Sequence, residues 1–145
     1  MLYIYCQKTF VKKNYNTHKF YNTYIIKVPD DNYIIISLRS FGPDNYLLLD
    51  MNANKILIYS PYENKGLLSR RKLTKEESFS ILALFESKEY MGIPENNDVV
   101  AFDAIEIEIT SIIKKIRKHI HHTMPTDKTV KDIIKIYTEL NVVKN

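Results

Sequence analysis

Residues 20–59 read FYNTYIIKVPDDNYIIISLRSFGPDNYLLLDMNANKILIY, and they carry the strongest structural signal in the chain. Four segments rich in β-branched and aromatic residues alternate here with clusters of Asp, Asn, Pro and Gly, which are typical of turns. The segments are residues 20–28, 33–38, 46–49 and 55–59. Short strands joined by such turns predict an antiparallel β-meander. We expect a further short strand at 2–5 and the end of the sheet at 60–66.

Two helices are predicted after the meander. The first follows a basic link at 70–72, where Thr74 and Glu77 have the spacing of a capping box. In that motif the hydroxyl and the carboxylate each satisfy a free backbone N–H group of the first turn. Apolar residues at helical spacing extend this helix over about residues 75–88. The second helix starts after Pro125 and Asp127, and its amphipathic pattern consists of Val130, Ile133, Ile134, Tyr137 and Leu140.

Between the helices, residues 99–109 alternate between apolar and polar residues, which is typical of a half-buried strand. The continuation at 109–122 fits either a helical stripe or the second strand of a hairpin. We favour a hairpin with its turn near Thr110 and Ser111, because Glu106 and Glu108 would then lie opposite Lys or Arg side chains. The sequence therefore predicts a single α+β domain over residues 1–145. It consists of an antiparallel β-meander, a helix, a β-hairpin and a C-terminal amphipathic helix packed on the sheet.

The length and composition are those of an ordinary globular domain. The chain has 145 residues, of which 45% are apolar and 26% are charged. A chain of this length can bury roughly two-thirds of its unfolded surface, so it needs neither a disulfide nor a metal to fold. Cys6 is the only cysteine, which excludes an intramolecular disulfide and a thiolate metal cluster. No apolar run approaches the roughly 18 residues of a membrane span, and the N-terminus lacks the pattern of a secretory signal. We expect a cytoplasmic protein with no membrane association and no cofactor.

Charge is distributed unevenly along the chain. Residues 1–75 carry 12 basic and 5 acidic residues, residues 76–108 carry 1 basic and 9 acidic residues, and residues 109–145 carry 8 basic and 3 acidic residues. The acidic segment 86–108 predicts a surface that docks a basic protein partner, because complementary charge speeds and selects association. The candidate partner-binding residues are Glu89, Glu95, Asp98 and Asp103. The alternative interpretation is an ordinary solvated surface.

Two basic stretches, 70–72 and 114–122, suggest a second function class. Cations in these stretches would bind phosphates, and the numerous Tyr residues would offer stacking surfaces for bases. The candidate residues are Arg70, Arg71, Lys114, Lys115, Arg117 and Lys118. No signature of a known nucleic-acid-binding motif accompanies them.

The sequence predicts neither a metal site nor a catalytic site. His119 and His121 would lie about 7 Å apart on one face of a strand, a spacing at which two imidazoles can share a metal. Neither an HExxH motif nor a Cys pair supplies further ligands, and Glu106, Asp103 and His18 are the other candidates. His122 would join His119 only on a helix. There is no GxSxG motif, and three scattered glycines cannot form a phosphate-binding loop.

The favoured function class is a non-catalytic protein-binding domain. Many small bacterial immunity proteins, which neutralise a partner toxin by covering it, are of this type. The likeness is one of type only and assigns no residues. The alternative is a nucleic-acid-associated protein that uses the two basic stretches, and an enzyme with a His-centred site ranks third.

Overall fold

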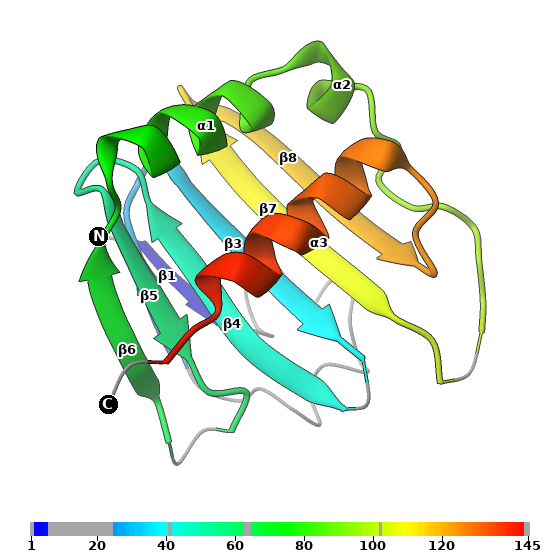
Figure 1. Ribbon diagram of the computed structural model, residues 1–145, viewed down its shortest axis with the longest axis horizontal. Helices are drawn as coiled ribbons and strands as arrows, with labels where there is room; N and C mark the ends of the chain where they lie inside the picture. Colours follow the sequence, from blue (N-terminus) through cyan, green and yellow to red (C-terminus); the bar gives the residue numbers. More distant parts are fainter. Residues whose placement is uncertain (1, 6–24, 41, 63–64, 102, 144–145) are drawn as a thin grey trace.

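The computed structural model describes residues 2–5, 25–40, 42–62, 65–101 and 103–143. They form an α+β fold in which helices cover one face of a six-stranded antiparallel sheet (Figure 1). The strand order is β6-β5-β4-β3-β7-β8, and β1 and β2 pair in a separate two-stranded sheet. The elements are β1 (Leu2–Tyr5), β2 (Ile25–Val28), β3 (Tyr33–Arg39), β4 (Pro43–Asp50), β5 (Lys55–Tyr59), β6 (Leu67–Lys72), α1 (Lys75–Phe85), α2 (Lys88–Met91), β7 (Glu106–Ile113), β8 (Ile116–Thr123) and α3 (Lys128–Leu140).

The predicted meander is confirmed in its centre and corrected at its start. β3, β4 and β5 follow one another both in the chain and in the sheet. The strand predicted at 20–28 was expected to lead the meander, but its described part, β2, pairs with β1 instead. The reason is that β3 already pairs with β4 on one side and with β7 on the other, so no edge of β3 remains for β2. Residues 20–24 lie outside the described residues.

The prediction that the sheet ends at 60–66 and that 70–72 is a link is wrong, because β6 follows. Gly66 adopts φ 54°, a left-handed conformation that favours glycine, and the chain returns beside β5. The register between β5 and β6 shifts between Ile58 and Tyr59. β6 is an edge strand, where charged side chains are tolerated because they remain in water. Because of its basic residues, β6 lacks the apolar pattern by which a strand is predicted from the sequence.

The predicted hairpin is confirmed, but its turn lies at Lys114 and Lys115. These residues have φ values of 50° and 69°, the positive angles that a two-residue type I′ hairpin turn requires. The backbone N–H of Lys114 donates to Asn32 Oδ1 and that of Lys115 donates to Asp31 Oδ1, both at a distance of 2.9 Å. These acceptors belong to the connection between β2 and β3, so the turn is stabilised by residues that are distant in the sequence. The residues near the turn therefore do not indicate its position. Thr110 and Ser111 are buried within β7.

Helix α1 begins as predicted and ends earlier. Both hydrogen bonds of the capping box between Thr74 and Glu77 are present. The predicted helix at 75–88 is interrupted after Phe85, because the Ser87 side chain accepts from the backbone N–H of Tyr90 and caps the separate helix α2. None of the described helices combines the length and the apolar character that a membrane crossing would require.

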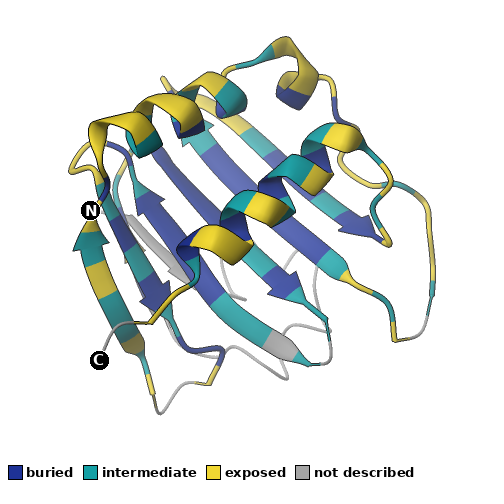
Figure 2. Cartoon of the chain, in the orientation of Figure 1, coloured by how far each residue is buried: buried dark blue, intermediate teal, exposed yellow. Residues whose placement is uncertain are grey.

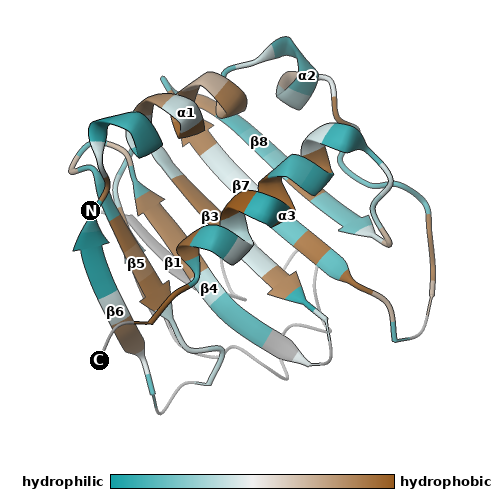
Figure 3. Ribbon diagram, viewed as in Figure 1, coloured by the Kyte–Doolittle hydropathy of each residue, from teal (hydrophilic) through white to brown (hydrophobic). Residues whose placement is uncertain are grey.

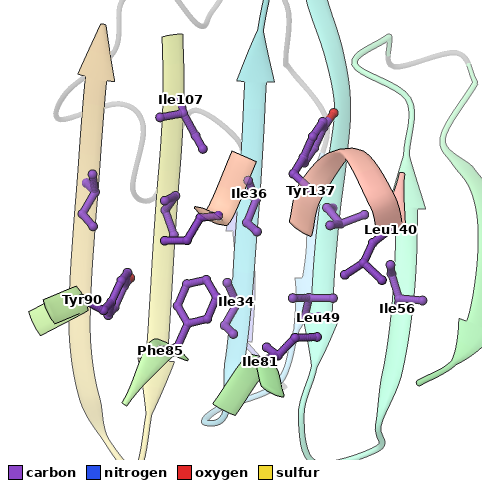
Figure 4. Packing of buried hydrophobic residues seen from close by; sticks show 14 of the residues in the cluster. Ile34, Ile36, Leu49, Ile56, Ile81, Phe85, Tyr90, Ile107, Tyr137 and Leu140 are labelled. Atoms are coloured by element: carbon purple, nitrogen blue, oxygen red, sulfur yellow. The ribbon is translucent and has the colours of Figure 1, made fainter. Parts of the chain in front are cut away.

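The main core lies between the sheet and the helices (Figure 2). Phe85 and Tyr90 contact one another with ring centroids 4.7 Å apart, and the Tyr90 hydroxyl is 2.7 Å from Ser111 Oγ. The C-terminal end of α3 is fixed by Tyr137, whose hydroxyl donates to the Asn45 carbonyl at 2.6 Å. Figure 4 shows how strand and helix side chains meet in this core: Ile34, Ile36, Leu49, Ile56, Ile81, Phe85, Tyr90, Ile107, Tyr137 and Leu140.

The opposite face of the sheet carries a second, smaller core. It contains residues of β2, β3 and β4, namely Ile26, Val28, Tyr33, Ile35, Tyr46 and Leu48. The sheet is thus buried on both faces at β3 and β4. This explains why the centres of these strands are continuous apolar runs rather than alternating ones.

Candidate functional site

The connection between α2 and β7, residues 92–105, runs along the outer side of β8 (Figure 1). We call it the 92–105 link. The backbone N–H of His121 donates to the Glu95 carbonyl at 2.6 Å, beside a parallel bridge between Asn96 and His121. The Asn97 side chain continues this pairing, because its Nδ2 donates to the Thr123 carbonyl at 2.7 Å and its Oδ1 accepts from the Thr123 N–H at 3.1 Å. An amide side chain therefore closes this edge of the sheet in place of a further strand.

Two side chains of β8 hold the start of the link. Lys118 Nζ donates to the carbonyl of Met91 at 3.0 Å and also to that of Ile93. His122 Nε2 donates to the Pro94 carbonyl at 2.7 Å, which identifies Nε2 as a protonated nitrogen because a carbonyl can only accept. These contacts fix residues 91–97 against β8. The rest of the link therefore extends from a segment that is held in place by hydrogen bonds to β8; we call residues 91–97 the base of the link.

The four acidic residues predicted to bind a partner all lie on this side of the molecule. Glu89 is on α2, whereas Glu95, Asp98 and Asp103 are on the link, and all four are exposed. Asp98 and Asp103 have φ values of 55° and 51°, which Asp tolerates better than most residues. Glu95 lies beside His121 of β8, whereas Asp103 lines a hollow together with Arg39 and Ser40 at the end of β3, so the four are spread along this side of the molecule rather than gathered in a compact cluster. We call them the acidic strip.

Apolar side chains accompany the acidic strip, and sequence reasoning missed them. Val99, Val100 and Ile105 are 40%, 94% and 46% exposed, and this part of the link is yellow in Figure 2 and partly brown in Figure 3. The strand predicted to start at residue 99 is wrong here, because β7 starts at Glu106. The available signal was the turn-forming run Asn96-Asn97-Asp98 followed by two adjacent valines, which breaks the alternation of a strand.

An open, mostly apolar hollow adjoins the link. Its volume is about 620 Å³, and it lies between the link, the connection from β8 to α3, and α3 itself. Met124, which is 54% exposed, forms part of its wall, and the Met124 N–H donates to the Ile105 carbonyl at 2.7 Å. An exposed apolar area beside charged residues is the usual composition of a protein–protein interface.

Glu106 lies opposite Thr123 and Glu108 lies opposite His121, so neither faces Lys or Arg across the hairpin as predicted, and each has a histidine as its diagonal neighbour. The turn lies four residues later than expected, so the register brings His119 and His121 to this position. His119 Nε2 is 3.6 Å from Glu108 Oε2, and His121 Nε2 is 3.8 Å from Glu106 Oε2. On its other side β7 pairs with β3, and there Arg39 is in register with Glu106.

These pairs form a polar layer on the face away from the helices. His119 is buried, and its Nδ1 is 2.8 Å from Thr110 Oγ1. The neighbouring Glu106 carboxylate raises the pKa of His121; burial opposes the rise, and the charge of Glu108 adds to it. Within the described residues, no three or more His, Cys, Asp or Glu side chains are grouped so that they could hold a metal ion. Cys6 and His18 lie outside those residues.

The two basic stretches are not brought together. Residues 70–72 are in β6 and residues 114–118 are at the β7–β8 turn and in β8, at opposite edges of the sheet. Five strand spacings separate these edges, which is roughly 24 Å. Three of the six candidate cations contact groups of the chain itself: Arg71 pairs with Glu77 at 2.8 Å, Lys114 with Glu86 at 3.0 Å, and Lys118 with the carbonyls of Met91 and Ile93. Arg70, Lys115 and Arg117 are exposed.

No family model, curated protein or solved structure matches this chain. A functional proposal therefore depends on the surface described above.

Proposed function

We propose that this chain is a non-catalytic protein-binding domain that docks a basic partner protein on the acidic strip and on the apolar residues beside it. The observation that carries the proposal is Val100, which is 94% exposed on a link whose base is held against β8. Covering such a side chain with a partner would contribute on the order of 2 kcal/mol. In the free molecule this side chain contributes almost nothing to stability.

The chemistry of the surface defines the partner. Carboxylates of the strip favour a basic surface, and the apolar side chains between them favour apolar contacts at its centre. Proteins that act on nucleic acids tend to be basic, and an inhibitor or immunity-type protein neutralises such a partner by covering it. A chain with a single cysteine suits a reducing compartment, so we place this function in the cytoplasm.

The rigid base of the link supports the same function. Hydrogen bonds from His121, Thr123 and Lys118 hold residues 91–97 before any partner binds. A surface that is already ordered loses less conformational entropy on association, so more of its contact energy appears as affinity.

Association with nucleic acid is the alternative function, and it has less support. Nucleic-acid affinity grows with the number of phosphates that are contacted at once. The exposed cations Arg70, Lys115 and Arg117 are divided between two edges of the sheet. A probe of single-stranded or duplex nucleic acid that binds at low salt, and weakens when Lys115 and Arg117 are neutralised, would support this alternative instead.

The test compares three proteins: the wild type, Glu95→Lys/Asp98→Asn, and the control Glu139→Lys. Asn is chosen at position 98 because it tolerates the positive φ there. Glu139 is an exposed residue of α3 that lies outside the acidic strip. Each protein is immobilised, basic proteins are captured from the source cells, and the captured protein is purified and titrated against all three.

We expect the association rate of the purified partner to fall with rising salt and to be slower with the strip variant. The control should behave like the wild type, and the thermal midpoints of all three should agree. Complementary charge acts mainly on association, so dissociation should change less. Equal association rates for all three proteins, or no retained basic protein, would contradict the proposal.

A further inference from the structure

The two edges of the six-stranded sheet are finished differently. The β8 edge is closed at residues 121–123 by the backbone of Glu95 and by the side chain of Asn97. At the other edge, Leu73 N–H donates to the Asn54 carbonyl at 2.7 Å, which is a bond toward β5. Hydrogen-bonded pairs alternate along an antiparallel ladder, so Arg71 and Ser69 also bond β5, whereas the backbone groups of Arg70 and Lys72 point away from the sheet.

Most of these outward groups have no hydrogen bond in the described part of the chain. The Lys72 carbonyl accepts from Arg71 Nη1 at 2.9 Å. The N–H and C=O groups of Arg70 and the N–H group of Lys72 remain available at the edge. β6 therefore offers donors and an acceptor in the spacing that another extended chain would match.

Cations surround this edge. Lys55 and Lys72 are directly opposite one another in a pair without ladder hydrogen bonds, where side chains lie closest. Like charges in that position destabilise a sheet. Asp50 is next to Lys55 in the register of β4 and β5, but its Oδ1 accepts from the N–H groups of Asn52 and Ala53. Arg70 follows on the same face, so three cations line the edge.

We propose that β6 is a docking site for an extended acidic segment of a partner protein, which adds to the sheet as a seventh strand. Its backbone bonds the outward groups of Arg70 and Lys72. Acidic side chains at alternate positions then lie opposite these two residues and relieve the repulsion between Lys72 and Lys55.

Charge selects this occupant over the others. A second copy would set the cations of one β6 against those of the other. A nucleic acid would use the cations but not the outward backbone donors and acceptor. Cations on an edge strand also disfavour pairing with most other strands, whereas a strand with acidic side chains pairs favourably with them. The site lies at the opposite edge of the sheet from the acidic strip, so it does not depend on the proposed function.

The test uses a defined probe, the acetylated and amidated peptide TEVEVET, titrated into the isotope-labelled full chain and followed by NMR. We expect amide shift changes centred on β6 and β5. The peptide TKVKVKT should not bind. An analogue of the acidic peptide that is N-methylated on alternate amides should bind at least about fivefold more weakly, because it loses at least one net hydrogen bond of about 1 kcal/mol.

Two variants of the protein separate charge from backbone pairing. Arg70→Gln removes the charge and keeps the outward N–H, whereas Arg70→Pro removes both and leaves the bonds of Arg71 and Ser69 to β5 in place. We expect the affinity for TEVEVET to fall from wild type to Arg70→Gln and again to Arg70→Pro. The N-methylated peptide makes the same distinction on the wild-type protein if the proline variant does not fold.

Several outcomes overturn the proposal. They are equal affinity for the methylated and unmethylated peptides, no shift changes in β6 at millimolar peptide, and concentration-dependent dimerisation through β6. Displacement of the peptide by a short oligothymidylate that binds more tightly at β6 would assign the edge to nucleic acid.

Discussion

Glu77 takes part in two interactions, and the one with Arg71 requires its negative charge. Its carboxylate accepts from the Thr74 N–H at 2.9 Å and from the Arg71 guanidinium at 3.0 and 2.8 Å. The hydrogen bonds from Arg71 lower the pKa of Glu77 to about 2, from an ordinary value of 4.5, while partial burial opposes the shift. A pKa that is lowered in the folded state stabilises the fold above the unfolded value. This contribution is lost as the pH falls from about 4.5 through about 2.

We predict that Glu77→Gln lowers the thermal midpoint at neutral pH and has little effect near pH 2. Glutamine can still cap the helix, so the difference reports the charge and its pairing with Arg71. The measurement is the thermal midpoint of both proteins across this pH range. A difference between the two proteins that is the same at both ends would show that the charge is not responsible.

The hydroxyl of Thr74 supports the other half of the capping box. It accepts from the Glu77 N–H at 3.1 Å, and Thr74→Ala should lower the free energy of unfolding by about 1 kcal/mol. Thr74→Ser keeps the acceptor and should remain close to the wild type. Denaturant midpoints of the three proteins measure this, and equal midpoints for the alanine and serine variants would remove the cap as the cause.

The pKa of His121 offers a pH test of the polar layer. Glu106→Gln removes the negative charge of the carboxylate that raises this pKa, so His121 should titrate at lower pH in the variant. In the wild type, the raised pKa stabilises the fold below the ordinary value of 6.5, and this stability is lost as the pH rises through the folded value. NMR titration of the imidazole measures both proteins. Identical curves would mean that Glu106 does not set the protonation of His121.

At the scale of elements, those whose signals are local were predictable from the sequence. The amphipathic stripe of α3 and the capping box of α1 lie within a few residues of one another and were recovered. β6 was not, because an edge strand needs no apolar alternation. The break between α1 and α2 was missed because Ser87 looks like an ordinary helix residue until its side chain is seen to cap Tyr90.

The β7–β8 turn can be improved by residues that prefer its conformation. Lys114 and Lys115 both have positive φ, which costs a residue with a side chain about 1 kcal/mol. Lys114→Asn/Lys115→Gly should therefore raise the free energy of unfolding by roughly 1 kcal/mol, since Asn-Gly is a preferred type I′ pair. The pair of Lys114 with Glu86 is exposed and subtracts little. A lower denaturant midpoint in the double variant would contradict this account of the turn.

At the scale of the whole molecule, different residues of the 92–105 link contribute to stability and to the candidate site. Val99→Ser/Val100→Ser should change the free energy of unfolding by no more than about 0.5 kcal/mol, because these side chains face water. Asn97→Ala should cost about 1–3 kcal/mol, because it leaves both backbone groups of Thr123 without their bonds. Chemical denaturation measures both. A large loss in the valine variant would mean that the valines belong to the fold.

The candidate site was predictable only in part, because its acidic residues can be recognised from charge but its exposed apolar residues cannot. Carboxylates remain in water in almost any fold, so Glu89, Glu95, Asp98 and Asp103 could be selected from charge alone. Whether a valine is buried depends on what packs against it, and no local pattern distinguished Val100 from a core residue. The acidic strip and the cations of β6 end up at opposite edges of the sheet, which a sequence of alternating charge blocks does not reveal.

The hydrogen bonds that Asp31 and Asn32 make to the β7–β8 turn bear on the order of folding. A hairpin ordinarily closes by itself within microseconds, since its turn residues already favour the reversal. Here the two lysines disfavour the reversal, and their backbone donors bond acceptors 84 and 82 positions earlier in the chain. We therefore expect the hairpin to gain its turn after the β2–β3 connection has formed. The connection precedes β7 and β8 in the chain, so it leaves the ribosome before them, and we expect it to be present when their turn forms.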